Sequence, residues 1–171
     1  MKANQTADGL IEVDGPALEQ LNRGAATSAR RRDHLLLHDA HADAVQRILM
    51  SMMAGTYVAP HCHHRQRETL IALFGHCTVL IFDDRGRLQR RVPMRPAADM
   101  TPGCCILELP VHTWHSVIVP GGEQCTLFEV KPGPYLADET EFAPWAPREG
   151  DASVPAMLEA LAVLAPGQRI P

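Results

Sequence analysis

Between residues 45 and 131 the chain alternates short apolar runs with turn-forming residues. The runs recur about every ten residues, and no helical spacing separates them. This pattern is typical of an antiparallel barrel or jelly roll and argues against a parallel α/β sheet. Strands are predicted near 45–53, 57–63, 69–74, 76–83, 87–93, 103–108, 115–119 and 125–131. The segment Asp83-Asp84-Arg85-Gly86 is predicted to form a hairpin turn, because glycine tolerates a positive φ.

The segment before residue 45 follows a different pattern. A short strand is predicted at 10–13 and an amphipathic helix at 16–29. Asp14-Gly15-Pro16 indicates the helix start, because it combines a capping residue with proline in the first turn. Residues 30–44 are polar and irregular, so a surface loop is predicted there.

The segment after residue 131 is rich in proline. Four prolines between 132 and 147 exclude a central strand, and a final helix capped by Ser153 is predicted at 154–164. The chain is therefore interpreted as one domain, 1–171. Its parts are an N-terminal strand, helix and loop (1–44), a barrel (45–135), and a proline-rich tail with a C-terminal helix (136–171).

Composition and charge narrow the class of partner. The chain has 171 residues, with 16 Lys+Arg against 20 Asp+Glu, and a net charge of −4 argues against nucleic acid. Acids flank the arginines at 30–32 and 85–95, which are interpreted as solvated faces. No apolar run reaches the ~20 residues of a membrane span, and no secretory signal is expected at the start. Five cysteines without framework spacing indicate reduced thiols in a cytoplasm.

A histidine pair carries the clearest chemistry. His61 and His63 are two residues apart on a predicted strand, so their side chains share one face and those of Cys62 and His64 lie on the other. The next predicted strand starts near Glu68 and can pair back, which would bring the Glu68 carboxylate beside both imidazoles. Two imidazoles and a carboxylate are competent ligands for a divalent metal.

A fourth ligand is expected from a later strand. His115 begins an alternating run with Val117 and Val119 and is predicted to project inward with them. His112 follows Pro110 in a predicted turn, where it is expected to be exposed or to support a ligand from outside the metal's coordination shell.

These residues resemble the motifs of the cupin superfamily. Its first motif, G-x5-H-x-H-x4-E-x6-G, is matched at every fixed position, by Gly55, His61, His63, Glu68 and Gly75. Its second motif is matched in part: Pro110 and His115 fit, whereas His112 and Val119 occupy the glycine and asparagine positions. The resemblance implies a mainly β, cupin-like barrel or jelly roll with short terminal helices, and a metal bound by His61, His63, Glu68 and His115.

A narrower resemblance extends over residues 10–150. The segments RRRDHLLLH, VQRIL, GTYVAPHCH, GHCTVLIFDDRG, WHSV and EVKPGPY are similar to those of WbuC-type cupin metalloproteins. That family is associated with bacterial polysaccharide (O-antigen) gene clusters. The resemblance implies a bacterial protein and a carbohydrate-derived ligand.

Three imidazoles and one carboxylate leave two positions open on an octahedral metal. One divalent ion per chain is predicted, and the sequence leaves Zn, Fe, Ni and Mn open. The open positions suit a bidentate hydroxy-ketone or hydroxy-acid, as in a metal-dependent isomerase or epimerase. With iron(II) the same positions suit a dioxygenase, whereas zinc in a closed tetrahedron would be structural.

Two residues are candidates for catalysis. Glu129 lies among apolar positions of the last strand, where burial raises a carboxyl pKa, and Tyr57 has the same parity as His61. Cys104 and Cys105 are adjacent, so their two thiols cannot both face the metal. The roles of several other polar residues stay open: His112, Arg47, Tyr135 and the Cys104-Cys105 pair.

Two classes of function follow from these features. One is a metal-dependent enzyme acting on a small oxygenated molecule, and the other is a non-catalytic cupin whose metal holds a ligand for binding or sensing. A homodimer is expected in both cases, because outward apolar residues such as Phe128 and Val130 need cover.

Overall fold

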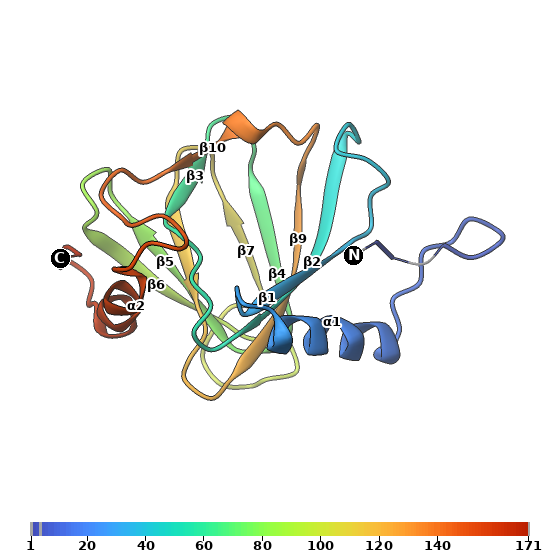
Figure 1. Ribbon diagram of the computed structural model, residues 1–171, viewed down its shortest axis with the longest axis horizontal. Coiled ribbons are helices and arrows are strands. Elements are labelled where there is room, and N and C mark those ends of the chain that lie inside the picture. Colours follow the sequence, from blue (N-terminus) through green and yellow to red (C-terminus); the bar gives the residue numbers. More distant parts are fainter. Residues whose placement is uncertain (1, 4, 171) are drawn as a thin grey trace.

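The computed structural model describes residues 2–3 and 5–170. Two five-stranded antiparallel sheets face each other, with a helix on the outer side of each (Figure 1). The first sheet has the order β1-β2-β9-β4-β7, formed by Arg32–Leu36, Val45–Met53, Gln124–Pro132, Glu68–Gly75 and Ile106–Leu109. The second has the order β10-β3-β8-β5-β6, formed by Thr140–Phe142, His61–His63, Trp114–Ile118, Cys77–Phe82 and Leu88–Met94. The predicted all-β jelly roll is confirmed.

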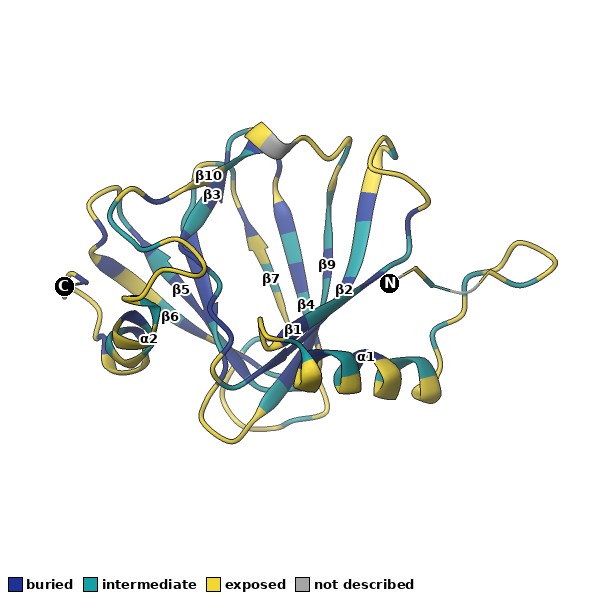
Figure 2. Ribbon diagram, in the orientation of Figure 1, coloured by how far each residue is buried: buried dark blue, intermediate teal, exposed yellow. Residues whose placement is uncertain are grey.

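The core lies between the two sheets. Strand residues alternate between the faces of a sheet, so apolar side chains at every second position meet their counterparts from the other sheet. Met52, Leu70, Val79 and Leu127 belong to this cluster, and their side chains are at most 2% exposed. Figure 2 shows this burial along the strands, with exposed residues concentrated in the loops.

Each helix covers the outer face of one sheet. Helix α1, Gly15–Thr27, begins where Asp14 Oδ1 accepts a hydrogen bond from the backbone N–H of Ala17. Its Leu21 packs with Leu35 of β1 and with Phe128 of β9. The predicted need for a second chain to cover Phe128 is therefore wrong, because α1 already covers it.

Helix α2, Val154–Val163, packs Met157 and Leu161 against Leu80 and other apolar residues of the second sheet. Both predicted helices are confirmed to within two residues at each end. The predicted side-chain cap is wrong: Ser153 stands at the N-cap position, but its side chain makes no capping hydrogen bond.

Two predictions for the N-terminal segment are wrong. Residues 10–13 form no strand and hold only an isolated bridge between Gln5 and Ile11. Residues 30–44 are not all loop, because β1 pairs with β2 along its whole length and extends the first sheet. This polar segment is a strand because it pairs with the long strand β2. The local pattern of residues does not predict that pairing.

Strand β3 is shorter than predicted. Residues 57–60 make no ladder, and their carbonyl groups have other partners: Arg32 Nη1 donates to Tyr57 O, Ser116 Oγ to Val58 O, and the backbone N–H of Ala143 to Pro60 O. Strand β7 is shifted, beginning at Ile106 rather than 103. The predicted turn after Asp83 is confirmed, with Gly86 at φ 76°.

The proline-rich tail runs along the second sheet and, as predicted, contains no central strand. It contains a 3-10 turn, Ala137–Glu139, and the short β10, which pairs with β3 at the edge of the sheet. This edge position places Thr140 and Phe142 beside the histidine pair of β3.

Candidate metal centre

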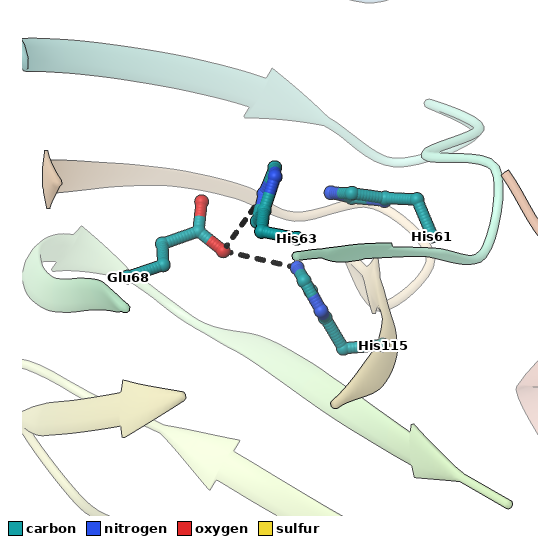
Figure 3. Close-up of side chains that lie close together, drawn as sticks. All are labelled: His61, His63, Glu68 and His115. Carbon is teal, nitrogen blue, oxygen red and sulfur yellow. Dashed lines mark ion pairs between the residues drawn. The ribbon is translucent and has the colours of Figure 1, made fainter. Parts of the chain in front are cut away.

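Four side chains from both sheets converge at one point between them (Figure 3). His61 and His63 point inward from β3, and His115 stands opposite His61 on the neighbouring strand β8. Glu68 is the first residue of β4, which belongs to the other sheet. The expectation that this strand pairs back onto the histidine strand is wrong: the chain crosses to the first sheet, and the carboxylate reaches across the core.

The donor atoms are close enough to share one ion. Glu68 Oε2 lies 3.0 Å from His115 Nε2 and 3.7 Å from His63 Nε2. The rings of His61 and His115 have centroids 4.2 Å apart. One donor atom from each of the four residues falls within 4.8 Å of all the others.

Hydrogen bonds at the far side of each ring orient the imidazoles. His61 Nδ1 is 2.9 Å from Ala59 O, and His115 Nδ1 is 2.9 Å from Thr113 O. A carbonyl only accepts, so these Nδ1 atoms carry the proton and the Nε2 lone pairs face the centre. His63 Nδ1 is 3.2 Å from Thr140 Oγ1. Metal-binding histidines are oriented in this way in proteins.

Two buried atoms at the centre make no hydrogen bond: His63 Nε2 and Glu68 Oε2. A buried polar atom without a partner is costly, and a divalent cation between these atoms would satisfy both. The nitrogen and carboxylate donors fit a borderline divalent metal. The group therefore fits a metal ion.

The centre holds His61 and His63 neutral and Glu68 charged. Burial, with the charge of His115, lowers the pKa of His61 to about 3, and burial lowers the pKa of His63 to about 4. Burial opposes ionisation of Glu68 too, but contact with His115 outweighs it and lowers its pKa. The same contact outweighs burial at His115 and raises that pKa.

A second carboxylate faces the same cavity. Glu129 is buried on β9 opposite Leu70, and its Oε1 lies 2.6 Å from Lys131 Nζ. Burial and the charge of Glu68 raise the pKa of Glu129 to about 7, although Lys131 opposes the shift. A carboxyl with this pKa can take up or release a proton near neutral pH.

The cavity has a volume of about 210 Å³ and contains residues that the sequence patterns did not indicate. Arg30, Arg32, His34 and Glu149 line it together with the four donors and Glu129. Glu149 accepts from Arg30 Nε at 2.7 Å and from Arg32 Nη2 at 2.8 Å. The reading of these arginines as a solvated face is wrong for Arg32, which is buried.

The pairing of β1 with β2 brings Arg32 and His34 to the cavity, and no local sequence pattern predicts this pairing. Glu149 lies 117 residues away from Arg32 in the chain, so no local pattern could join them. The only local sign of strand β1 is the apolar run Leu35-Leu36-Leu37 after His34.

Tyr57 does not reach the centre. Residues 57–60 are not strand, so the parity with His61 is lost. The Tyr57 ring packs in the cluster beneath α2, and its hydroxyl donates to Pro147 O at 2.8 Å. Burial raises the pKa of Tyr57 to about 12.

Other sequence candidates also lie away from the cavity. Arg47 is outside its lining, and its backbone contacts His38. Tyr135 is exposed and stacks near His41, with ring centroids 5.0 Å apart. Cys104 and Cys105 are free thiols outside the cavity lining.

Several solved protein structures are similar to this chain. The chain resembles protein SO0799 from Shewanella oneidensis, with 12% identity, 79% of this chain and 81% of that chain covered, and a TM-score of 0.52. It resembles L-ribose isomerase from Cellulomonas parahominis, with 15% identity, 70% and 72% coverage, and a TM-score of 0.52. The fold is cupin-like.

A third similar structure is CapF with the inhibitor 3-isopropenyl-tropolone, at 14% identity, 68% coverage of this chain and a TM-score of 0.51. The chain spans 33% of CapF, and 51% of a similar protein from Acidithiobacillus ferrooxidans ATCC 23270. At these low identities, the structural likeness shows the fold alone.

A family model described as "Domain of unknown function (DUF6016)" matches residues 13–94. That stretch includes three of the four donors and ends before His115. A search of curated proteins found no match. Within the described residues, no helix is long and apolar enough to cross a membrane.

Proposed function

We propose that the protein is a divalent-metal cupin that transfers a proton on a small, oxygenated, anionic metabolite, as a sugar isomerase or epimerase does. The observation that carries this proposal is Glu129, a buried carboxylate with a raised pKa in the same cavity as the four donors. When bound, the metal supplies Lewis acidity to an oxygen next to the reacting carbon. Glu129 removes the proton from that carbon and, in an isomerisation, returns it to the neighbouring one.

The charges of the cavity favour an anionic ligand. Three cationic side chains, Arg30, Arg32 and Lys131, offset three carboxylates, Glu68, Glu129 and Glu149. A divalent ion would leave the cavity with a positive excess, which attracts a carboxylate or phosphate group. Arg30 reaches the solvent, since 55% of its side chain is exposed, and it can meet an anion at the mouth.

The substrate class draws on the similar proteins. L-ribose isomerase is named for a sugar reaction, and the inhibitor of CapF is a tropolone, a compound with adjacent keto and hydroxyl oxygens. Two adjacent oxygens suit the two open positions of an octahedral metal with four protein ligands. The resemblance to WbuC-type cupins supports an origin of the substrate in bacterial polysaccharide metabolism.

A non-catalytic binding role is the second candidate, and the Glu129–Lys131 ion pair favours it. The Lys131 ammonium, 2.6 Å from Glu129 Oε1, opposes the rise of the Glu129 pKa and makes this carboxylate a weaker base than the same buried group would be without an ion pair. In that case the cavity would bind the same anionic ligands without transferring a proton.

The test has two parts. Untagged protein is analysed for metal, with His63→Ala as the variant expected to lose it. The metal-loaded protein is then screened by thermal shift with tropolone, sugar phosphates and hydroxy acids, and compounds that bind are incubated in D2O. Deuterium entering a carbon-bound position supports the enzyme, and a melting shift without exchange supports the binding protein. If the untagged protein contains no metal and no compound shifts its melting temperature, both the enzyme and the binding role are contradicted.

A further inference from the structure

Strand β3 carries a second group of metal-ligating side chains on its outer face. His61 and His63 point into the core, so Cys62 between them points to the other side. Glu141 of β10 is the register partner of Cys62, and His64 follows directly after the strand. Figure 1 shows β3 and β10 side by side at the end of the second sheet. Donor atoms of Cys62, His64 and Glu141 all lie within 4.8 Å of one another.

The two ring nitrogens of His64 contact different partners. His64 Nε2 lies 3.1 Å from Glu141 Oε2, close to the separation of roughly 3.3 Å between two ligands of a tetrahedral zinc. His64 Nδ1 lies 3.3 Å from His112 Nδ1. One nitrogen therefore faces the other donors while the second is held by a neighbour, as in established metal sites.

The backbone fixes His112 beside His64. His112 adopts φ 61°, a conformation that non-glycine residues rarely take, and its N–H donates to His63 O at 2.8 Å. This strained turn keeps the His112 ring 5.3 Å from that of His64. His112, which occupies the glycine position of the second cupin motif, thus has a side chain that can position His64.

Cys62 is the least expected member of the group. Its side chain is 2% exposed, yet it belongs to none of the three apolar core clusters of the described residues. A buried thiol beside an imidazole and a carboxylate is a typical donor for zinc, which accepts sulfur, nitrogen and oxygen together.

We propose that Cys62, His64 and Glu141 form a second divalent metal site of zinc-like preference, back to back with the inner centre across β3. The thiol proton of Cys62 passes to solvent as the thiolate binds, and His112 positions His64. The ion ties the edge strand β10 to β3, and β10 carries Thr140 and Phe142, which line the inner cavity. The site does not depend on the proposed enzymatic function.

Cobalt(II) titration of metal-free protein separates the two sites, because the inner group contains no sulfur. Thiolate-to-cobalt charge-transfer absorption therefore reports the outer site alone. We expect two cobalt equivalents per chain and this absorption in the wild-type protein. The double variant His61→Ala/His63→Ala should keep one equivalent and the absorption.

The decisive comparison is Cys62→Ser against Cys105→Ser, a matched removal of one thiol elsewhere. The absorption and one equivalent should disappear in Cys62→Ser and persist in Cys105→Ser. If Cys62→Ser does not fold, His64→Ala decides, since that side chain is 39% exposed and the thiol remains. The variant His112→Gln should keep the absorption but weaken cobalt binding by roughly 10–100-fold.

The proposal is overturned if the wild-type protein binds one equivalent without charge-transfer absorption. It is equally overturned if the absorption survives Cys62→Ser or, where that variant is unfolded, His64→Ala.

Discussion

The chemistry of the inner centre depends on which proton each imidazole carries. The carbonyls of Ala59 and Thr113 fix the protons of His61 and His115 on Nδ1, and burial keeps His61 and His63 neutral. His115 differs, because Glu68 raises its pKa. Below that pKa, His115 takes up a second proton on Nε2, which faces Glu68, and a metal ion would compete with this proton.

This difference predicts how metal affinity depends on pH. As the pH falls below the raised pKa of His115, one proton competes with the metal, so affinity falls about tenfold per pH unit. Below pH about 4 the dependence steepens as His63 and then His61, with pKa values of about 4 and 3, take up protons. Competition with a chelator of known affinity measures the slope. A slope near three protons just below pH 6.5 would show that the imidazoles titrate as ordinary histidines.

Glu129 is the residue whose replacement separates catalysis from binding. For an enzyme, Glu129→Gln should retain the metal while turnover falls by roughly 10²–10⁴-fold, because the base is lost and the shape is kept. The change leaves Lys131 buried without its carboxylate, which costs stability. The double variant Glu129→Gln/Lys131→Met is the control for that loss. Unchanged turnover in the folded single variant would exclude Glu129 as the base.

At the scale of elements, the turn between β4 and β5 depends on Gly75. Its φ is 63°, and a Cβ there would come 1.8 Å from the backbone oxygen of Gln124. Gly75→Ala should therefore lower the free energy of unfolding by more than the ~1–2 kcal/mol of a left-handed residue. Gly121→Ala is the matched control, since no atom lies within 4 Å of the added Cβ. Equal denaturation midpoints for the two variants would contradict this account.

The sequence predicted those elements whose pattern is local. The strands from residue 45 to 131 and both helices follow hydrophobic periodicity and turn chemistry, and motif spacing brought His61, His63, Glu68 and His115 together as a candidate group. Strand β1 depends on pairing with β2, and Glu149 reaches Arg32 from the far end of the chain. Tyr57 was misplaced because the strand begins only at His61.

At the scale of the whole molecule, a homodimer stays a prediction. Phe128 no longer supports it, but Leu73, Phe74 and Ile106 of β4 and β7 are 45%, 55% and 58% exposed at one end of the first sheet. Light scattering at micromolar concentration measures the mass in solution. A value of 37.6 kDa, twice 18.8 kDa, is expected, and a value of 18.8 kDa would contradict the dimer.

Metal binding should also stabilise the whole fold, because the four donors join the two sheets. An ion that binds only the folded state adds about 2.7 kcal/mol when its concentration is 100 times Kd. The midpoint of thermal unfolding should therefore rise with metal concentration, and thermal denaturation with and without metal measures this.

The most direct test is anomalous diffraction at the absorption edge of the metal, from crystals of the loaded protein. The account predicts a peak between His61, His63, Glu68 and His115, about 2.0–2.2 Å from three Nε2 atoms and the Glu68 carboxylate, with at least one water completing the shell. A loaded protein with no peak at this position would contradict the inner metal centre. A peak with four protein ligands in a closed tetrahedron would contradict its open positions.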